Sequence, residues 1–268
     1  MDFFDDKGRC LPSENSRVFA NKQSDYYKVN RKELNYNEVF DRSKKFGDAV
    51  DGFDAMSFEY QSNNLLNKIE NNKGFRNILN GPHIPFLYKE VNENKDLGTD
   101  LEIFQLRKLK ASFGDKFPES HFKAVLQSDS KLNNNIKLEP GVGYENFIDF
   151  AKKKTVVGWY FPQAFQEYDI NSQRMRIKEL PQSNDFNYCL SGGKDVCSAL
   201  VGCPELLISD EHYSPILCLS AYVHSDPRLI LLLKSYGPHM EFWCMTQILI
   251  KGVMQVSEQW SGGLTIYE

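Results

Sequence analysis

The sequence has no apolar run long enough to cross a membrane, and it has no amino-terminal secretion signal. Its longest aliphatic run, residues 229–233, is far shorter than the roughly 18 residues that a membrane helix needs. The opening residues, Met-Asp-Phe-Phe-Asp-Asp, supply neither the basic nor the apolar segment of a signal peptide. These absences predict a cytoplasmic protein with no membrane partner, and they leave open an export route without a readable signal.

An excess of basic residues is also missing. The formal net charge is −4, from 32 lysines and arginines against 36 acidic residues. Contacts to nucleic-acid phosphates depend on a clear basic excess, so we expect no nucleic-acid partner. Two local basic clusters, residues 107–110 and 152–154, are more typical of solvated helix faces.

Cysteine and histidine are scarce and unevenly placed. Five of the six cysteines and three of the five histidines follow residue 186. Scattered cysteines without a secretion signal are typical of reduced thiols in a cytosol. Cys189, Cys197 and Cys203 are separated by seven and five residues, whereas zinc ribbons place about two to four residues between their paired ligands. The sequence therefore predicts no metal site and no cofactor.

Hydrophobic spacing predicts an α+β fold with a mostly helical amino-terminal half. Apolar residues recur at threes and fours in several polar segments, which is the spacing of amphipathic helices. Two further segments, residues 83–91 and 121–127, are predicted to be strands, and Pro85 makes the first an edge strand. The predicted helices cover residues 37–50, 57–71, 99–113 and 144–154.

The carboxy-terminal part is predicted to be a mixed or antiparallel sheet packed by one long helix. That helix is assigned to residues 241–260, where apolar residues again recur at threes and fours. A domain boundary is placed near residue 140, giving regions 1–140 and 141–268, and a single fused domain stays open. The predicted strands cover residues 155–161, 174–180, 186–190, 216–223, 229–234 and 264–267.

The most distinctive local pattern is Ser191-Gly192-Gly193-Lys194. It lies between a predicted strand and a predicted helix, where backbone N–H groups at a helix start can converge on an anion. Together with Asp195, it resembles the Ser-Gly-Gly-x-Asp-Ser loop of the PP-loop ATP pyrophosphatases, which implies phosphate binding. Val196 stands where that loop has its serine, and the chain after it is short for that family's α/β domain. A plain strand-to-helix turn is the alternative.

Cys197 lies in the first turn of the same predicted helix. The positive end of a helix lowers a thiol pKa, and a histidine base would make such a thiol a nucleophile. His224 and His239 are the candidate bases, and Asp226 is a candidate to orient one of them. The alternative is a buried structural cysteine, because cysteine is among the most buried residue types.

Two function classes remain from these observations. The favoured prediction is a non-catalytic protein-interaction or effector-like factor with a protein partner. The alternative is a cysteine-dependent hydrolase or transferase that uses Cys197. Aromatic residues 159–161 with Phe165 are interpreted as core rings rather than a binding groove, and Asp210 with Glu211 as part of an exposed loop.

Overall fold

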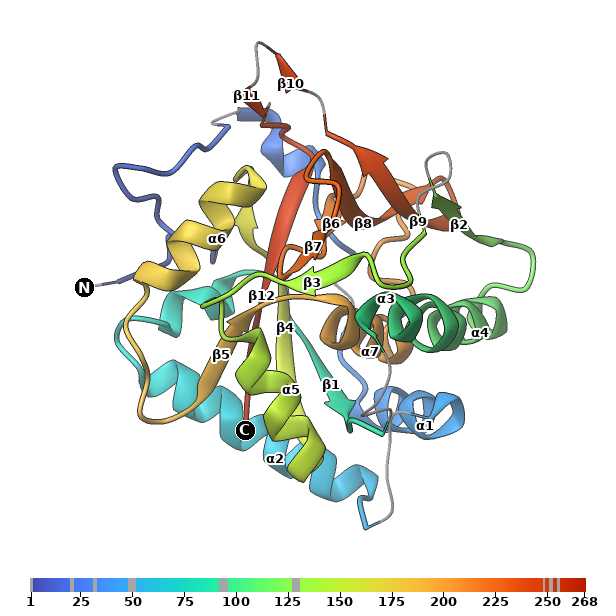
Figure 1. Cartoon of the computed structure of the whole chain (residues 1–268). Helices are drawn as coiled ribbons and strands as arrows, with labels where there is room; N and C mark the ends of the chain where they lie inside the picture. The colour runs from blue at the N-terminus through green and yellow to red at the C-terminus, as the bar shows by residue number, and fades with distance from the viewer. Residues whose placement is uncertain are drawn as a thin grey trace.

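The protein is an α+β structure in which helices surround a large mixed sheet, so the predicted fold class is confirmed (Figure 1). The computed structural model describes residues 2–19, 22–30, 33–47, 52–91, 96–126, 131–247, 249–250, 253–254 and 256–268.

Several helices begin where a polar side chain caps them. Asn35 accepts a hydrogen bond from the Glu38 N–H, and Asp54 accepts one from the Ser57 N–H, which satisfies donors that the first helical turn leaves unpaired. The α-helices are α1 (Tyr36–Phe46), α2 (Ala55–Asn71), α3 (Leu97–Thr99), α4 (Leu106–Lys116), α5 (Tyr144–Lys153), α6 (Ile170–Glu179) and α7 (Gly193–Gly202). Two 3₁₀ turns, η1 (Lys22–Tyr26) and η2 (Arg76–Asn80), and a π-helical segment, η3 (Asp100–Gln105), complete the set.

The main sheet runs in the order β1-β4-β12-β6-β8-β9-β2, with β5 also paired to β12. Strand β12 is parallel to β6, and β2 is parallel to β9, whereas the other pairs of this sheet are antiparallel. Its strands are β1 (Ile84–Tyr88), β2 (Phe122–Leu126), β4 (Val156–Gln166), β5 (Asn187–Leu190), β6 (Ile216–Cys218), β8 (Leu229–Tyr236), β9 (His239–Thr246) and β12 (Trp260–Tyr267). Small sheets pair β3 (Ile136–Leu138) with β7 (Tyr222–His224), and β10 (Leu249–Ile250) with β11 (Val253–Met254).

Strands β4 and β12 form the centre of the sheet and are buried at every position. Strand β1 lies at one end of the strand order, so the edge position predicted from Pro85 is confirmed. Strands from both sides of the predicted boundary near residue 140 share this sheet, since β1 and β2 precede it and the other strands follow it.

The predicted helix over residues 241–260 is wrong. Its first part is strand β9, where Met240, Phe242 and Cys244 are buried and their neighbours are less so. This alternation has a period of two, and β9 pairs along its length with the aliphatic strand β8, so tertiary pairing overrides the helical spacing of the apolar residues. The end of the segment begins strand β12. Residues 248, 251, 252 and 255 of the predicted helix lie outside the described residues.

The strand predicted over residues 174–180 is also wrong, because this segment belongs to helix α6. Asp169 caps the helix by accepting a hydrogen bond from the Ser172 N–H. Gln173 and Ile177, four residues apart, form its buried side. Polar and apolar residues alternate in this segment. That alternation has the period of a β-strand, which is why the sequence predicted one.

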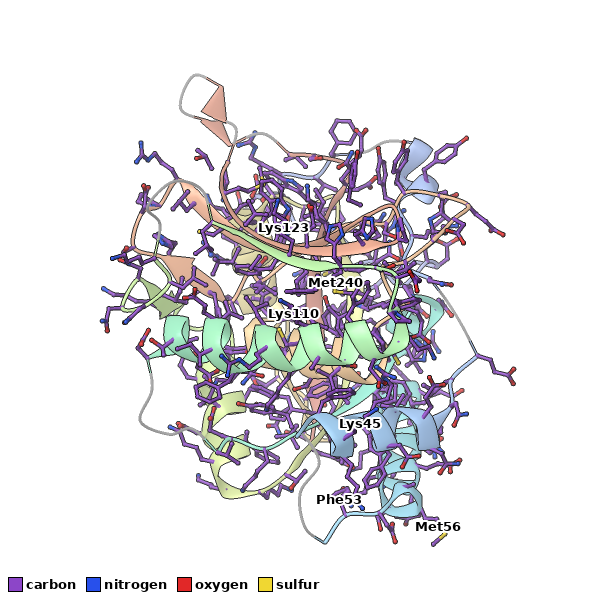
Figure 2. All side chains as sticks on the ribbon, turned by 90° about the vertical axis from the view of Figure 1, so that its right-hand side faces the viewer. Lys45, Phe53, Met56, Lys110, Lys123 and Met240 are labelled. Atoms are coloured by element: carbon purple, nitrogen blue, oxygen red, sulfur yellow. The ribbon has the colours of Figure 1, made fainter. Side chains whose placement is uncertain are left out.

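Helix α7 is enclosed by other elements, and all ten of its residues are buried. It packs against β1 on the sheet and against α1 and α4 on its outer sides. In Figure 2, α4 runs across the side of the molecule that faces the viewer. Lys110 is labelled on α4, and Lys123 is labelled on β2. Arg107 and Lys110 are exposed, as expected for a solvated helix face.

Candidate functional site

Ser191 and Gly192 join β5 to α7, and Gly193 and Lys194 are the first residues of the helix, so the predicted strand-to-helix turn is confirmed. Three of its four backbone N–H groups have partners within the protein. The Gly192 N–H donates to Asp195 Oδ1 at 2.9 Å, and the Lys194 N–H donates to the Tyr144 hydroxyl at 3.0 Å. The Ser191 N–H donates to the Gly263 carbonyl at 3.0 Å.

The two glycines allow aromatic rings to approach the loop. A Cβ atom on Gly192 would lie 2.6 Å from the Tyr144 ring, and one on Gly193 would lie 2.7 Å from the Tyr222 ring. The ring planes of Tyr144 and Tyr222 are themselves nearly perpendicular, with centroids 5.5 Å apart. The glycine pair therefore has a packing role that needs no bound ligand.

Lys194 turns its side chain inward and forms a buried ion-pair cluster. Its ammonium lies 2.7 Å from Glu90 Oε2 and 2.6 Å from Asp100 Oδ2, and all three side chains are almost completely buried. Gln105 donates to the same Asp100 oxygen at 3.2 Å, because the π-helical turn η3 brings these two residues to one side. Two carboxylates thus already neutralise the positive charge that an anion would use.

Asp195 links this cluster to the sheet. Its carboxylate accepts hydrogen bonds from the Tyr144 hydroxyl at 2.8 Å and the Thr265 hydroxyl at 2.5 Å, in addition to the Gly192 N–H. Burial raises the pKa of this carboxyl group, and the hydrogen bonds act in the opposite direction. Burial also raises the pKa of Tyr144 well above its usual value, so its phenol stays protonated and continues to donate.

Anion binding at this loop stays a prediction. An anion would have to displace Asp195 from the Gly192 N–H and compete with Glu90 and Asp100 for the Lys194 ammonium. Both exchanges would leave buried carboxylates without their partners, which is strongly unfavourable.

The structure places the proposed nucleophile, Cys197, and one candidate base, His239, near opposite ends of the main sheet. Cys197 is 1% exposed on α7, which packs on β1 at one end of the sheet. His239 begins β9, near the opposite end, and its ring stacks on that of His121 with centroids 3.8 Å apart.

His224 and Asp226 do lie together, but through the backbone. The Asp226 N–H donates to His224 Nδ1 at 2.9 Å, while the Asp226 carboxylate binds Arg228 at 2.7 Å. The hydrogen bonds from Arg228 lower the pKa of Asp226 to about 2. Use of Cys197 with a histidine in catalysis stays a prediction that needs a chemical test.

Alkylation provides that test. We expect iodoacetamide at neutral pH to leave Cys197 unmodified in the folded protein, because the thiol is buried inside α7. Cys203, at the carboxy-terminal end of α7, is the one partly exposed cysteine, and burial raises its pKa to about 12, so it reacts slowly. Mass spectrometry after proteolysis locates each adduct, and urea-unfolded protein, in which all six cysteines react, is the control. Rapid labelling of Cys197 in folded protein would support the nucleophile hypothesis instead.

A surface groove lined by tyrosines was not found from the sequence. Its volume is about 670 Å³, and it is formed by three segments distant in the chain: residues 26–27, the loop 209–214 and the β8–β9 turn. Tyr26, Tyr213 and Tyr236 line it and are 61%, 79% and 73% exposed. We call this surface the tyrosine groove. The only sequence signal near it was the exposed loop predicted around Asp210.

The tyrosine groove has an acidic lip. Asp210 and Glu211 are exposed there, as predicted, and neither is in an ion pair with another described residue. Lys234 also lines the groove, but its ammonium lies over the Trp243 ring at 4.3 Å and 3.7 Å from Glu241. The unbalanced charge at the lip is therefore negative.

The aromatic residues 159–161 and Phe165 lie in the core, so their interpretation as core rings is confirmed. Among the residues with described positions, no three His, Cys, Asp or Glu side chains are arranged to hold a metal ion. No helix in the described part of the chain is both long and apolar enough to span a membrane. Comparisons with protein families, curated proteins and solved structures found no match to this chain.

Proposed function

We propose that the protein is a non-catalytic interaction factor that binds an extended, basic, proline-containing segment of a partner protein in the tyrosine groove. The observation that carries this proposal is the convergence of three strongly exposed tyrosines from separate segments on one hollowed surface. Large exposed aromatic side chains gathered in this way are typical of recognition surfaces.

The chemistry of the groove favours this kind of segment. Proline-rich segments adopt an extended helix before binding, so they lose little conformational entropy when they dock between aromatic rings. Basic side chains on the segment would face Asp210 and Glu211 and could lie over the tyrosine rings. The same acidic lip disfavours nucleic acid, whose phosphates it would repel.

The cysteines of the protein favour a reducing cellular compartment. All six cysteines lie outside disulfide bonds, and every one except Cys203 is buried. Free cysteines in this number are typical of cytosolic proteins, so we propose a cytoplasmic site of action.

Peptide binding tests the function directly. A fluorescent peptide of about ten residues that alternates proline with arginine is expected to bind with a Kd of about 1–100 µM by fluorescence polarisation. Tyr213→Ala and Tyr236→Ala should each weaken binding about tenfold, because truncating an interface tyrosine removes roughly 1–2 kcal/mol. Tyr60→Ala is the matched control, since Tyr60 is 72% exposed on α2 and outside the groove.

The acidic lip provides a second measurement. The combined variant Asp210→Asn and Glu211→Gln should weaken binding and reduce its dependence on salt, because the steering charges are gone. A peptide with glutamate in place of arginine should not bind the wild-type protein. Equal binding of both peptides, or tyrosine variants that bind as tightly as Tyr60→Ala, would rule out this function for the groove.

A further inference from the structure

A second cavity, of about 190 Å³, lies between the start of α6, strand β7 and the first half of β8. It is separate in the fold from the tyrosine groove and shares no lining residue with it. Ile170, Leu219 and Ile230 give it an apolar wall, and Arg174, His224 and Gln247 give it polar groups. A mixture of apolar wall and few polar groups is typical of sites for small molecules.

Two of these polar side chains carry an atom without a partner. His224 and Gln247 are each 7% exposed, and neither His224 Nε2 nor Gln247 Oε1 makes a hydrogen bond within the described structure. Buried polar atoms almost always have partners, so two such atoms on one cavity point to a ligand that supplies them.

The hydrogen bond to His224 Nδ1 determines which ring nitrogen carries the proton. Nδ1 accepts a hydrogen bond from the Asp226 N–H, so in the neutral ring the proton is on Nε2. His224 therefore offers the cavity a hydrogen-bond donor, and Gln247 Oε1 offers an acceptor. A ligand that satisfies both must present one acceptor and one donor.

The charged side chain of the cavity, Arg174, is already engaged by the protein. The Arg174 guanidinium donates through Nε to the Ser220 carbonyl and through Nη2 to the Tyr222 carbonyl, both at 2.9 Å. Its Nε also lies 3.8 Å from the Glu139 carboxylate. Glu139 also binds the Lys178 ammonium at 2.8 Å, so this carboxylate is shared between the two cations. Because the two carbonyls and Glu139 already engage Arg174, an uncharged ligand fits better than an anion.

We propose that this cavity binds a small, neutral carboxamide or cyclic amide with a compact apolar body. The amide carbonyl accepts a hydrogen bond from His224 Nε2–H, and the amide N–H donates to Gln247 Oε1. The apolar body lies against Ile170, Leu219 and Ile230. An uncharged amide carries one acceptor oxygen and one donor nitrogen on the same carbonyl carbon, and these match the donor and the acceptor that lack partners in the cavity.

Benzamide is a suitable probe, and benzoate and methyl benzoate are its matched comparisons. Benzoate keeps the ring and the acceptor but adds charge and loses the donor, and methyl benzoate stays neutral but has no donor. With the full-length protein, we expect benzamide to show saturation-transfer NMR signals at about millimolar concentration. Both comparison compounds should bind at least about tenfold more weakly, because each leaves Gln247 Oε1 unpaired.

A variant tests the residue assignment. Gln247→Met has a similar volume and removes the acceptor, so it should weaken benzamide binding about tenfold or more. Gln182→Met is the control, because Gln182 is exposed between α6 and β5 and lines neither this cavity nor the tyrosine groove. It should leave benzamide binding unchanged.

The proposal is wrong if wild-type protein binds none of the three compounds, or binds all three equally. It is also wrong if folded Gln247→Met binds benzamide as tightly as wild type does. Should Gln247→Met fail to fold, the comparison of the three compounds on wild-type protein decides alone. Because the peptide experiment uses another surface, its result does not change this one.

Discussion

Lys194→Met is expected to lower the free energy of unfolding by about 3–5 kcal/mol. The substitution removes the ammonium that lies between Glu90 and Asp100, so these two buried carboxylates lose the positive charge that they share. Urea denaturation followed by circular dichroism measures the change. Lys110→Met is the matched control, because Lys110 is exposed on the outer side of α4 and should change stability by less than about 0.5 kcal/mol (Figure 2).

A charge-removing triple variant separates the electrostatic explanation from simple packing. Adding Glu90→Gln and Asp100→Asn to Lys194→Met removes the negative charges that Lys194 had offset, so it should recover a large part of the lost stability. If Lys194→Met were as stable as Lys110→Met, the ion-pair cluster would not stabilise the folded state, and Lys194 would be available for a ligand.

Gly192→Ala is expected to destabilise the protein by about 1–3 kcal/mol, because the added methyl group overlaps the Tyr144 ring. Gly114→Ala is the matched control. Gly114 is exposed within α4, and a Cβ atom there meets nothing within 4 Å, so alanine should stabilise the helix by about 0.5–1 kcal/mol. Thermal denaturation of the two variants should therefore shift in opposite directions.

The same pair of variants tests the anion prediction. If the loop binds phosphate, added phosphate should stabilise the wild-type protein and not Gly192→Ala. If the glycines serve only packing, phosphate should have no greater effect on wild type than on Gly114→Ala. A Gly192→Ala variant as stable as wild type would contradict the packing explanation.

The sequence predicted those elements in which local signals and tertiary environment agree. Helix α2 has a capping aspartate, an apolar face and a clear end, and it forms almost as expected. Strand β1 was placed at an edge by Pro85 alone. The segment at residues 241–260 failed because its apolar residues fit a helix as well as a strand. What decided its structure was pairing with β8, which local spacing does not reveal.

The candidate site, too, was predictable only in its local part. The strand-to-helix turn at Gly192 was predictable, because a glycine pair between a predicted strand and a predicted helix typically marks a turn. Its partners Glu90 and Asp100 lie about a hundred residues earlier, and no local pattern marks them. The tyrosine groove was missed for the same reason, since Tyr26, Tyr213 and Tyr236 meet only in the folded protein.

Strand β12 is the last strand in the chain, yet it binds β4, β5 and β6 near the middle of the sheet. On the ribosome, these partners therefore emerge before the strand that joins them. Until residues 260–267 are synthesised, the nascent chain exposes the unpaired edges of β4 and β6, which are templates for aggregation. The sheet can therefore close only after residues 260–267 have emerged from the ribosome.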